Sequence, residues 1–293
     1  MTEFLTAVAT GLGVGSIYAL IGVGYAFIYR TTASFTFAQG QLFGLGGLFA
    51  YTLYVKVGLP ALVALLLTAL IVGLVSALTE RVAIWPLARR GDTSLTWLIS
   101  TLGVAIIITG ASERIWGRHP LPVPNYIGST VVHLGSINIA TPYVVAIAVA
   151  LLTAFGIEAF QRFTLWGRAM RAVGDNRDGV ELAGVNVLAL GLMAFAVGGA
   201  LAGIAGFVLA PVTYAQATSG FTYTILAFAA IAIGGFSSHW GALLGGWIIG
   251  VAGAVGSTYI GLNYQQPIIF GVLLVVLLIR PEGLMSVRGT RQV

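Results

Sequence analysis

The stretch from Gln161 to Asn186 reads QRFTLWGRAMRAVGDNRDGVELAGVN, and it separates two long apolar runs. It holds seven charged residues, in a 293-residue chain that has only 14 Lys and Arg and 9 Asp and Glu. A segment this polar cannot lie in hydrocarbon, where every backbone polar group needs a protein partner. We therefore expect a loop in water that meets a soluble partner.

The rest of the chain has the composition of a membrane protein. Hydrophobic residues make up 58% and charged residues 8%, whereas soluble domains have about 25% charged residues. We predict one all-α domain over 1–293, a polytopic membrane helical bundle. The absence of cysteine excludes disulfides, thiolate catalysis and zinc–cysteine sites. The net charge of +5 is interpreted as arginines that fix membrane orientation, and not as a nucleic-acid surface.

Seven apolar runs are long enough to cross a bilayer, which takes about 20 residues. Two further runs, Phe35 to Val55 and Phe221 to Phe236, are interrupted by glycines and neutral polar groups. We therefore predict eight or nine membrane elements, some of them broken or re-entrant. The seven regular runs are 5–29, 60–79, 94–112, 141–160, 188–210, 240–260 and 266–279.

The two interrupted runs lie in opposite halves of the chain. Paired interruptions of this kind are typical of discontinuous helices near a transport site. The alternative is that each is a re-entrant packing element without substrate contact. The candidate pathway residues in these runs are Thr36, Phe37, Gln39, Gln41, Gly234 and Gly235.

Charged residues are sparse within the apolar runs. Glu80 and Arg81 stand at the end of one run, and Glu158 and Arg162 are four residues apart, so that they can pair on one helix face. The middle of the runs has no convincing Asp, Glu, Lys or Arg. This pattern argues against ion coupling and against a charged substrate held by a buried countercharge.

Glycines four residues apart recur along the chain. Small residues at this spacing form a flat helix face and let two backbones approach closely. We interpret them as packing contacts within one bundle. The pairs are Gly11/Gly15, Gly40/Gly44, Gly199/Gly203, Gly241/Gly245 and Gly246/Gly250.

Basic residues concentrate on one side of the predicted membrane topology, which carries 11 of the 14. By the positive-inside rule this side is cytoplasmic, with the N-terminus outside and the C-terminus inside a bacterial inner membrane. The largest external loop is then 113–140, whose part STVVHLGSINIA is expected to form short strands. The basic segments are 30–34, 80–92, 161–187 and the tail from Arg280.

The chain has few groups that could support catalysis or bind a cofactor. Its histidines, at positions 119, 133 and 239, form no pair with metal-ligand spacing, so we expect no metal site. No believable Ser–His arrangement is present. The lone lysine, Lys56, has no G-x-x-x-x-G-K-[ST] loop around it, so ATP would have to be bound by another subunit.

The polar loop has its own predicted substructure. Residues Gly167 to Val173 can form a short helix, residues Gly174 to Gly179 have turn composition, and Val180 to Ala183 can resume the helix before Gly184 ends it. The apolar side of the first helix can face the bundle and transmit force from a soluble partner. The alternative is a positive-inside anchor with no partner. That apolar side consists of Ala169, Met170 and Val173.

At this loop the chain resembles a known family. GRAMRAVGDNRDGVELAGVN resembles the coupling loop of the inner-membrane permeases of branched-chain amino acid ABC transporters, in the subfamily close to the first of that system's two permeases. GLGVGSIYALIGVGYAFIYR, FTFAQGQLFGLGG, LAGIAGFVLAP, LAFAAIAIGGFSSHWGALLGG and RPEGLM resemble further landmarks in the same order. The likeness covers nearly the whole chain.

The resemblance implies an importer in which a second permease, often a different chain, completes the pore. Two cytoplasmic ATPases carrying ATP and Mg²⁺ drive it, and an extracytoplasmic binding protein delivers the substrate. The cytoplasmic coupling loop is 161–187. The residues that match the ATPase-contacting part of this loop are Gly167, Arg168, Arg171, Ala172, Asp175, Ala183 and Gly184.

The substrate stays open between several classes. Thr36 stands where the family usually has Asn, and Gln41 where it usually has an acidic residue. Related permeases import urea, short amides and aromatic acids as well as branched-chain amino acids. A self-contained passive channel or facilitator is the alternative from another class, and an exporter is a weaker third.

Overall fold

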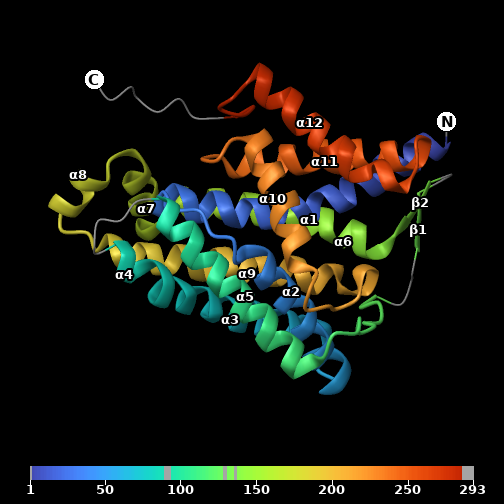
Figure 1. Cartoon of the computed structure of the whole chain (residues 1–293), viewed down its shortest axis with the longest axis horizontal. Coiled ribbons are helices and arrows are strands. Elements are labelled where there is room, and N and C mark those ends of the chain that lie inside the picture. Colours follow the sequence, from blue (N-terminus) through green and yellow to red (C-terminus); the bar gives the residue numbers. More distant parts are fainter. Residues whose placement is uncertain (1, 89–93, 128–130, 135–136, 286–293) are drawn as a thin grey trace.

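The computed structural model describes residues 2–88, 94–127, 131–134 and 137–285. The chain is a helical bundle, and its described strands form one two-stranded antiparallel sheet (Figure 1). The predicted all-α bundle is confirmed. Four of the basic residues used for the orientation argument, Arg89, Arg90, Arg288 and Arg291, lie outside the described residues.

Seven helical stretches are long and apolar enough to cross a membrane, and they match the seven regular runs predicted from sequence. The two interrupted runs form shorter helices, α2 with η1, and α10. The elements are α1 (Thr2–Thr32), α2 (Gln39–Ala50), η1 (Tyr51–Lys56), α3 (Ala61–Thr79), η2 (Glu80–Ile84), α4 (Trp85–Ala88), α5 (Ser94–Trp116), β1 (Val131–Leu134), β2 (Ile137–Ala140), α6 (Thr141–Phe163), α7 (Leu165–Asp175), α8 (Arg177–Leu182), α9 (Val187–Thr213), α10 (Gly220–Gly234), α11 (His239–Tyr259), η3 (Leu262–Tyr264) and α12 (Gln265–Ile279).

Two sets of helices share one plan. In the first set, α1 is followed by a non-helical segment, the short α2, and α3; in the second, α9 is followed by a non-helical segment, the short α10, and α11. The long helix of each set packs most extensively along the third helix of the other set. Figure 1 shows α1 and α9 running in opposite directions, as in an inverted repeat. The sequence alone shows no obvious repeat.

Glycines create the contacts between these sets. A Cβ added at Gly15 would overlap the backbone of Gly246, and one at Gly206 would overlap the carbonyl oxygen of Phe43. Gly199 likewise leaves room only for the side chain of Ser76. The glycines predicted to serve helix packing do so within this single bundle, since backbone is their neighbour at most of these sites.

The first interruption folds the chain back into the bundle. After α1 ends, residues 33–38 are non-helical, and Ala33 has a φ of 53°. Gln39, the first residue of α2, packs against Gly24 of α1. Gly24 lies eight residues before the end of α1, so α2 begins roughly 12 Å inside the bundle at 1.5 Å per residue. The predicted broken helix is therefore present.

The second interruption has the same form. Residues 214–219 separate α9 from α10, and Tyr214 has a φ of 60°. At its other end α10 stops at Gly234, and Gly235 has a φ of 106°, a conformation suited to glycine. The backbone N–H groups of Leu284 and Met285 donate to the carbonyls of residues 233 and 234, so the segment after α12 caps α10.

The second membrane span is longer than its sequence predicts. The run 60–79 was expected to end before Glu80, but α3 continues through the π-helix η2 into α4, giving one span from Ala61 to Leu87. The π-helical turn continues the backbone hydrogen bonding past Glu80 and Arg81, so these charged residues do not end the helix. Glu80 consequently lies inside the bundle and is only 5% exposed.

The segment between α5 and α6 closes the end of the bundle opposite α7. The predicted short strands are confirmed: β1 and β2 pair with Val131 opposite Ala140. Leu121 exchanges two backbone hydrogen bonds with Ala215, both 2.9 Å long. The Tyr126 hydroxyl donates to the carbonyl of Phe207 at 2.6 Å, and burial raises the pKa of this hydroxyl well above its usual range. This segment therefore fixes the turn between α9 and α10.

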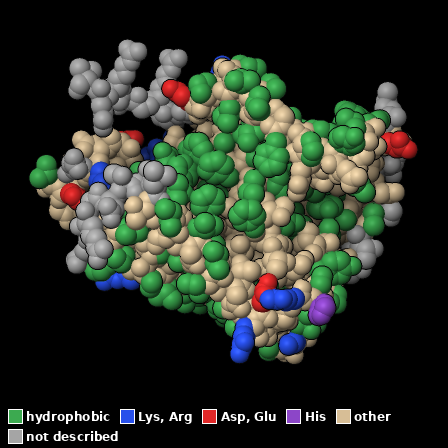
Figure 2. All heavy atoms as spheres, in the orientation of Figure 1, with side chains coloured by type: hydrophobic (Ala, Val, Ile, Leu, Met, Phe, Trp, Pro, Cys, Tyr) green, Lys and Arg blue, Asp and Glu red, His purple; other side chains and the backbone are tan. Residues whose placement is uncertain are grey.

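The outer surface is the apolar face expected of a bundle in lipid. Figure 2 shows hydrophobic side chains over much of the visible face and charged ones toward its margins. Along α3, one leucine in every helical turn is about 60% exposed. Since water would disfavour such a stripe, this side of α3 is expected to face lipid tails. The exposed residues are Leu62, Leu66, Leu70, Leu74 and Leu78.

A pair of glycine substitutions tests the close packing. Gly206→Ala is expected to lower the free energy of unfolding by about 1–3 kcal/mol or more, because the methyl group overlaps the Phe43 backbone. Gly156→Ala is the control, since nothing lies within 4 Å of its added Cβ. That change should raise stability by up to about 1 kcal/mol through helix propensity. Tryptophan-fluorescence melts in detergent measure both, and equal melting temperatures would refute the packing account.

Candidate functional site

The polar loop forms two helices at one end of the bundle, between α6 and α9 (Figure 1). Thr164 caps α7 by accepting the backbone N–H of Gly167 at 3.0 Å. Asn176 caps α8 by accepting that of Gly179 at 2.9 Å. The prediction of two short helices, the second ended by Gly184, is confirmed. Gly184 has a φ of 82°, a conformation that glycine adopts readily. The predicted turn from Gly174 to Gly179 is wrong, because the Asn176 cap confines the break to a single residue.

Helix α7 is amphipathic and lies against the bundle on its apolar side. Met170 and Val173 are 1% and 6% exposed and pack with Phe27 and Ile157. Gly167 is buried against the backbone of Phe160 and Gln161, where a Cβ would overlap. The apolar face predicted for this helix is thus confirmed. It anchors α7 directly on the ends of α1 and α6.

A charged chain of contacts connects α7 to the bundle. The Arg171 guanidinium lies 3.3 Å from Glu158 Oε1 of α6 and donates to Gln161 Oε1 at 3.3 Å. The other Glu158 oxygen lies 3.0 Å from Nε2 of His239, the first residue of α11. The expected pairing of Glu158 with Arg162 is wrong. Arg162 instead lies over the ring of Phe163, since α7 brings Arg171 to the inner side of Glu158.

The remaining coupling-loop candidates occupy different environments. Arg168, Ala172 and Asp175 are exposed on the side of α7 that faces away from the bundle. Ala183 and Gly184 are exposed where α8 ends. Arg171 alone combines an exposed portion with contacts to the bundle, its side chain being 35% exposed. The loop thus presents an open outer face and is attached to the bundle at one charged point.

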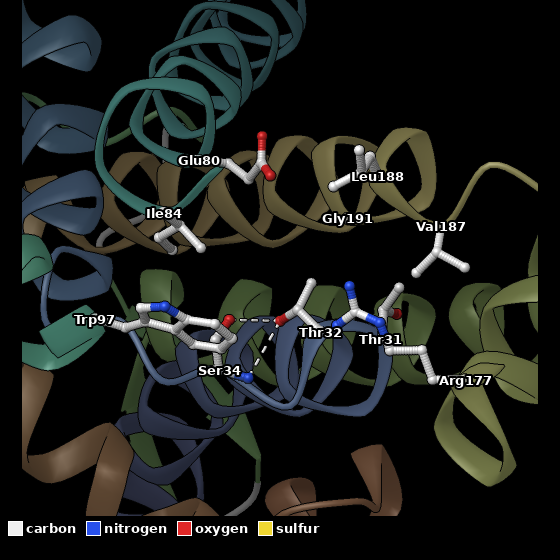
Figure 3. Close-up of a pocket in the computed structure, with 10 residues that line it drawn as sticks. All are labelled: Thr31, Thr32, Ser34, Glu80, Ile84, Trp97, Arg177, Val187, Leu188 and Gly191. Atoms are coloured by element: carbon white, nitrogen blue, oxygen red, sulfur yellow. Dashed lines mark hydrogen bonds between the residues drawn. The ribbon is translucent and has the colours of Figure 1, made fainter. Parts of the chain in front are cut away.

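A small cavity lies between α8 and the end of α1 (Figure 3). Its volume is about 30 Å³, and Glu80 and Arg177 contribute side chains to its lining. Among the described residues, Glu80 makes no hydrogen bond or ion pair. Arg177 reaches from α8 toward Thr31 and Thr32, and its only described carboxylate contact is with Glu181 at 3.9 Å. The start of α8 therefore lies beside a buried carboxylate on which the charge of its chain neighbour Arg81 acts.

The candidate pathway residues of the first half lie where α2 begins. Gln39 is fully buried, and its amide nitrogen donates to the carbonyl of Gly198 at 2.7 Å. The Thr36 hydroxyl accepts the backbone N–H of residue 38 at 3.2 Å, and the Phe37 N–H donates to Thr101 Oγ1 at 3.1 Å. Gln41 is different, because it lines a cavity. Three of the four candidates therefore hold the broken backbone in place.

The start of α10 meets the start of α2 at the same level. The backbone N–H of Gly40 donates to Thr224 Oγ1 at 3.1 Å, and a Cβ at Gly40 would overlap the carbonyl oxygen of Gly220. The Thr224 hydroxyl also donates to the carbonyls of Gly220 and Phe37, at 3.0 and 3.4 Å. Thr224 thus forms hydrogen bonds at the starts of both α2 and α10.

The second-half candidates, Gly234 and Gly235, lie apart from this meeting point, at the end of α10. Phe236, the next residue, packs against Phe35 with ring centroids 5.0 Å apart. Tyr29 joins them, with its ring 4.5 Å from that of Phe35. Aromatic rings therefore connect the segment that follows α1 with the segment that follows α10.

Sequence reasoning missed several residues that the fold brings together. Thr224 and Gly198 were not singled out, because their roles depend on helices distant in the chain. His239 was dismissed as a metal ligand, and its contact with Glu158 was not foreseen. A signal was available for His239: it follows Ser238, which caps α11 by accepting the N–H of Gly241 at 3.0 Å.

These features define a multi-pass membrane protein with two broken helices at its centre and an amphipathic helix at one end. Residues 7–279 match the family model described as branched-chain amino acid transport system / permease component. The chain belongs to this family. It is therefore a membrane permease, a transport component that functions in a complex with other subunits and is not an enzyme.

Curated relatives match over nearly the full length. The chain is 33% identical to the high-affinity branched-chain amino acid transport system permease protein BraD of Pseudomonas aeruginosa, over 97% of this chain and 96% of that protein. It is 30% identical to the corresponding protein LivH of Escherichia coli K12, over the same shares. The ribose import permease protein RbsC of Haemophilus influenzae is 26% identical over 80% of this chain and 72% of that protein. No solved structure matches the chain.

A double-mutant cycle tests the contact that attaches α7. Glu158→Gln and Arg171→Gln, singly and together, should give a coupling energy of about 0.5–1 kcal/mol, because both side chains are about one-third exposed. The control cycle uses Arg177 and Glu181, which are more exposed and 3.9 Å apart; it should give a value near zero. Thermal unfolding in detergent measures both. Indistinguishable coupling energies would show that the Glu158 contact has no special strength.

Proposed function

We propose that this permease is the membrane subunit of an ATP-driven importer for branched-chain or closely related amino acids. The observation that carries the proposal is helix α7. Its apolar side rests on α1 and α6, its outer side is exposed, and Arg171 connects it through Glu158 to the start of α11. Such a helix can receive force from a soluble engine and pass it to the bundle.

ATP and Mg²⁺ are then bound by two partner ATPase subunits, at the end of the bundle that carries α7. This end is cytoplasmic in the proposal, because the described loops there hold most of the basic residues. The N-terminus of α1 and the sheet β1–β2 lie at the opposite end (Figure 1), where an extracytoplasmic binding protein would dock. A second permease, in the proposal a different chain, completes the pathway.

The proposed mechanism is alternating access. ATP closes the two ATPases on each other, and α7 moves with them. Because α7 contacts α6 directly and α11 through Glu158, its displacement shifts two of the helices that pack against α1. The close glycine contacts make the helices of the core move as packed units rather than by gradual deformation. In the proposed mechanism this movement opens the pathway toward the outside.

The substrate class follows from the full-length relatives, which are named as branched-chain amino acid permeases. Two features of this chain agree with a small neutral or zwitterionic solute. The described spans hold no buried charge at the meeting point of α2 and α10, and the side chains there are Thr36, Gln39, Gln41 and Thr224. Urea, amides and aromatic acids remain rival substrates of the same type of importer.

Charge reversal at α7 tests the coupling role. Arg171→Glu places two carboxylates together at Glu158 and removes the basic contact, so it should disconnect the ATPases from the bundle. We expect leucine uptake into proteoliposomes to fall by about tenfold, because the substitution replaces an attraction with a repulsion and about 1.4 kcal/mol corresponds to a factor of ten. Stimulation of ATPase activity by the loaded binding protein should fall in parallel.

Lys56→Glu is the matched control. It reverses an exposed charge in η1. The Lys56 ammonium lies over the ring of Tyr51, and η1 packs against α2 and α3 rather than α7. This variant should copurify with the ATPases and keep its ATPase stimulation. If Arg171→Glu retains both uptake and stimulation while folding normally, α7 is not the point of coupling.

A further inference from the structure

A cavity of about 310 Å³ lies between α2, α5 and α10, a size within the range of about 300–1,000 Å³ typical of ligand sites. Gln41, Thr109 and Glu113 supply its polar groups. Apolar side chains line the space between these groups. They are Leu102, Ile106 and Phe221. We call this space the Gln41 cavity.

One end of the cavity is unsuited to lipid. Helix α5 is one of the two least buried spans, and a Cβ at Gly103 or Gly110 would meet nothing within 4 Å. The Thr109 hydroxyl donates to the carbonyl of Ala105 at 2.9 Å and is therefore compatible with an apolar surrounding. A carboxylate such as Glu113, one turn further along, is costly in hydrocarbon. The end of the cavity at Glu113 therefore faces water or a solute.

Gln41 lines the floor of the cavity, and one of its hydrogen-bonding groups is buried beneath that floor without a partner. Its side chain is 7% exposed, and its buried Oε1 has no hydrogen-bond partner among the described residues. Oε1 lies against Gly220, where α10 begins, and α2 begins two residues before Gln41. The floor thus combines an unpaired acceptor with the positive ends of two helix dipoles.

An α-amino acid has the groups that this floor lacks. Its ammonium group donates hydrogen bonds, as Gln41 Oε1 requires, and its carboxylate is attracted by helix N-termini. The two groups share one carbon, so a single molecule can satisfy both. Glu113 is already paired with Arg118 at 2.8 Å, so the cavity has no free countercharge for a cationic or anionic side chain.

We propose that the Gln41 cavity is a substrate subsite of this permease. It holds the head group of an α-amino acid against the Gln41 amide and the start of α10, while Leu102, Ile106 and Phe221 contact an aliphatic side chain. The inference rests on the proposed import of amino acids and adds a defined binding position within the membrane. It selects zwitterions with an uncharged side chain over lysine or glutamate.

The absence of cysteine from the chain permits a direct test of this position. Thr109→Cys is introduced into the assembled transporter in proteoliposomes and exposed to a membrane-impermeant thiosulfonate during ATP turnover. We expect modification about tenfold faster than for Leu70→Cys, because a thiolate forms only in contact with water. Leu70 is 59% exposed on the lipid-facing side of α3 and is the control. Leucine with its binding protein should slow the reaction at Thr109→Cys several-fold, and lysine should not.

A second variant tests the role of the amide. Gln41→Leu should lower leucine uptake by about tenfold, the loss expected for one hydrogen bond to a charged group, and leave ATPase stimulation intact. Gln266→Leu, which removes an exposed amide on α12, is the control and should keep full uptake. A functional reconstitution with normal ATPase stimulation shows that Gln41→Leu has folded.

The outcomes separate the subsite from the proposed function. If the wild-type complex transports leucine but Gln41→Leu transports equally well, the subsite is refuted and the importer stands. The subsite is also refuted if Thr109→Cys reacts as slowly as Leu70→Cys, which is the result expected if a second permease covers the cavity. It is refuted as well if Thr109→Cys reacts rapidly but leucine gives no protection. If the wild-type complex moves no amino acid with ATP, the proposed function fails and the subsite fails with it.

Discussion

The structure depends on the satisfaction of backbone polar groups where two helices begin in the middle of the bundle. In hydrocarbon no water can supply the missing hydrogen bonds, so protein groups must do so. Thr224 serves the starts of both α2 and α10, Thr101 accepts the Phe37 N–H, and Gln39 holds the carbonyl of Gly198. Glycines at the same level let the backbones approach closely enough for these bonds to form. The polar residues of the interrupted runs therefore first make the fold possible, and Gln41 Oε1, like Gln39 Oε1, is left without a hydrogen-bond partner among the described residues.

The centre of the bundle and the polar loop are held by different kinds of contact. The helices α1, α9 and α11 pack through glycines, whereas α7 rests on the ends of α1 and α6 through its apolar side and through Arg171. Glu158 connects Arg171 of α7 to His239 of α11, and the small cavity lined by Glu80 lies beside Arg177 of α8. In the proposed mechanism, force applied to the loop 161–187 reaches the core through the apolar side of α7 and through the contact between Arg171 and Glu158. The aromatic rings of Phe35 and Phe236 pack together just after the ends of α1 and α10.

The sequence was sufficient to predict features that depend on local pattern. Seven spans, two interrupted runs, the apolar side of α7 and the role of the glycine pairs all follow from spacing and composition. Features that depend on distant partners were not predictable in this way. The packing of α1 with α11 and of α9 with α3 has no local signal in the sequence. The hydrogen bond from the Gly40 N–H to Thr224 has none either. Glu158 was assigned to Arg162 by the four-residue rule, but a tertiary contact with Arg171 prevailed because α7 folds back beneath it.

The central claim is that this permease moves solute only when partner ATPases act on it. The direct measurement is uptake of radiolabelled leucine into proteoliposomes, comparing the assembled complex with binding protein and ATP against this chain reconstituted by itself. The account predicts accumulation against a gradient by the complex, loss of that accumulation when ATP is replaced by a non-hydrolysable analogue, and no uptake by the chain alone above that of empty liposomes. Rapid equilibration of leucine by the chain alone, with no effect of ATP in the complex, would contradict it and identify a passive facilitator.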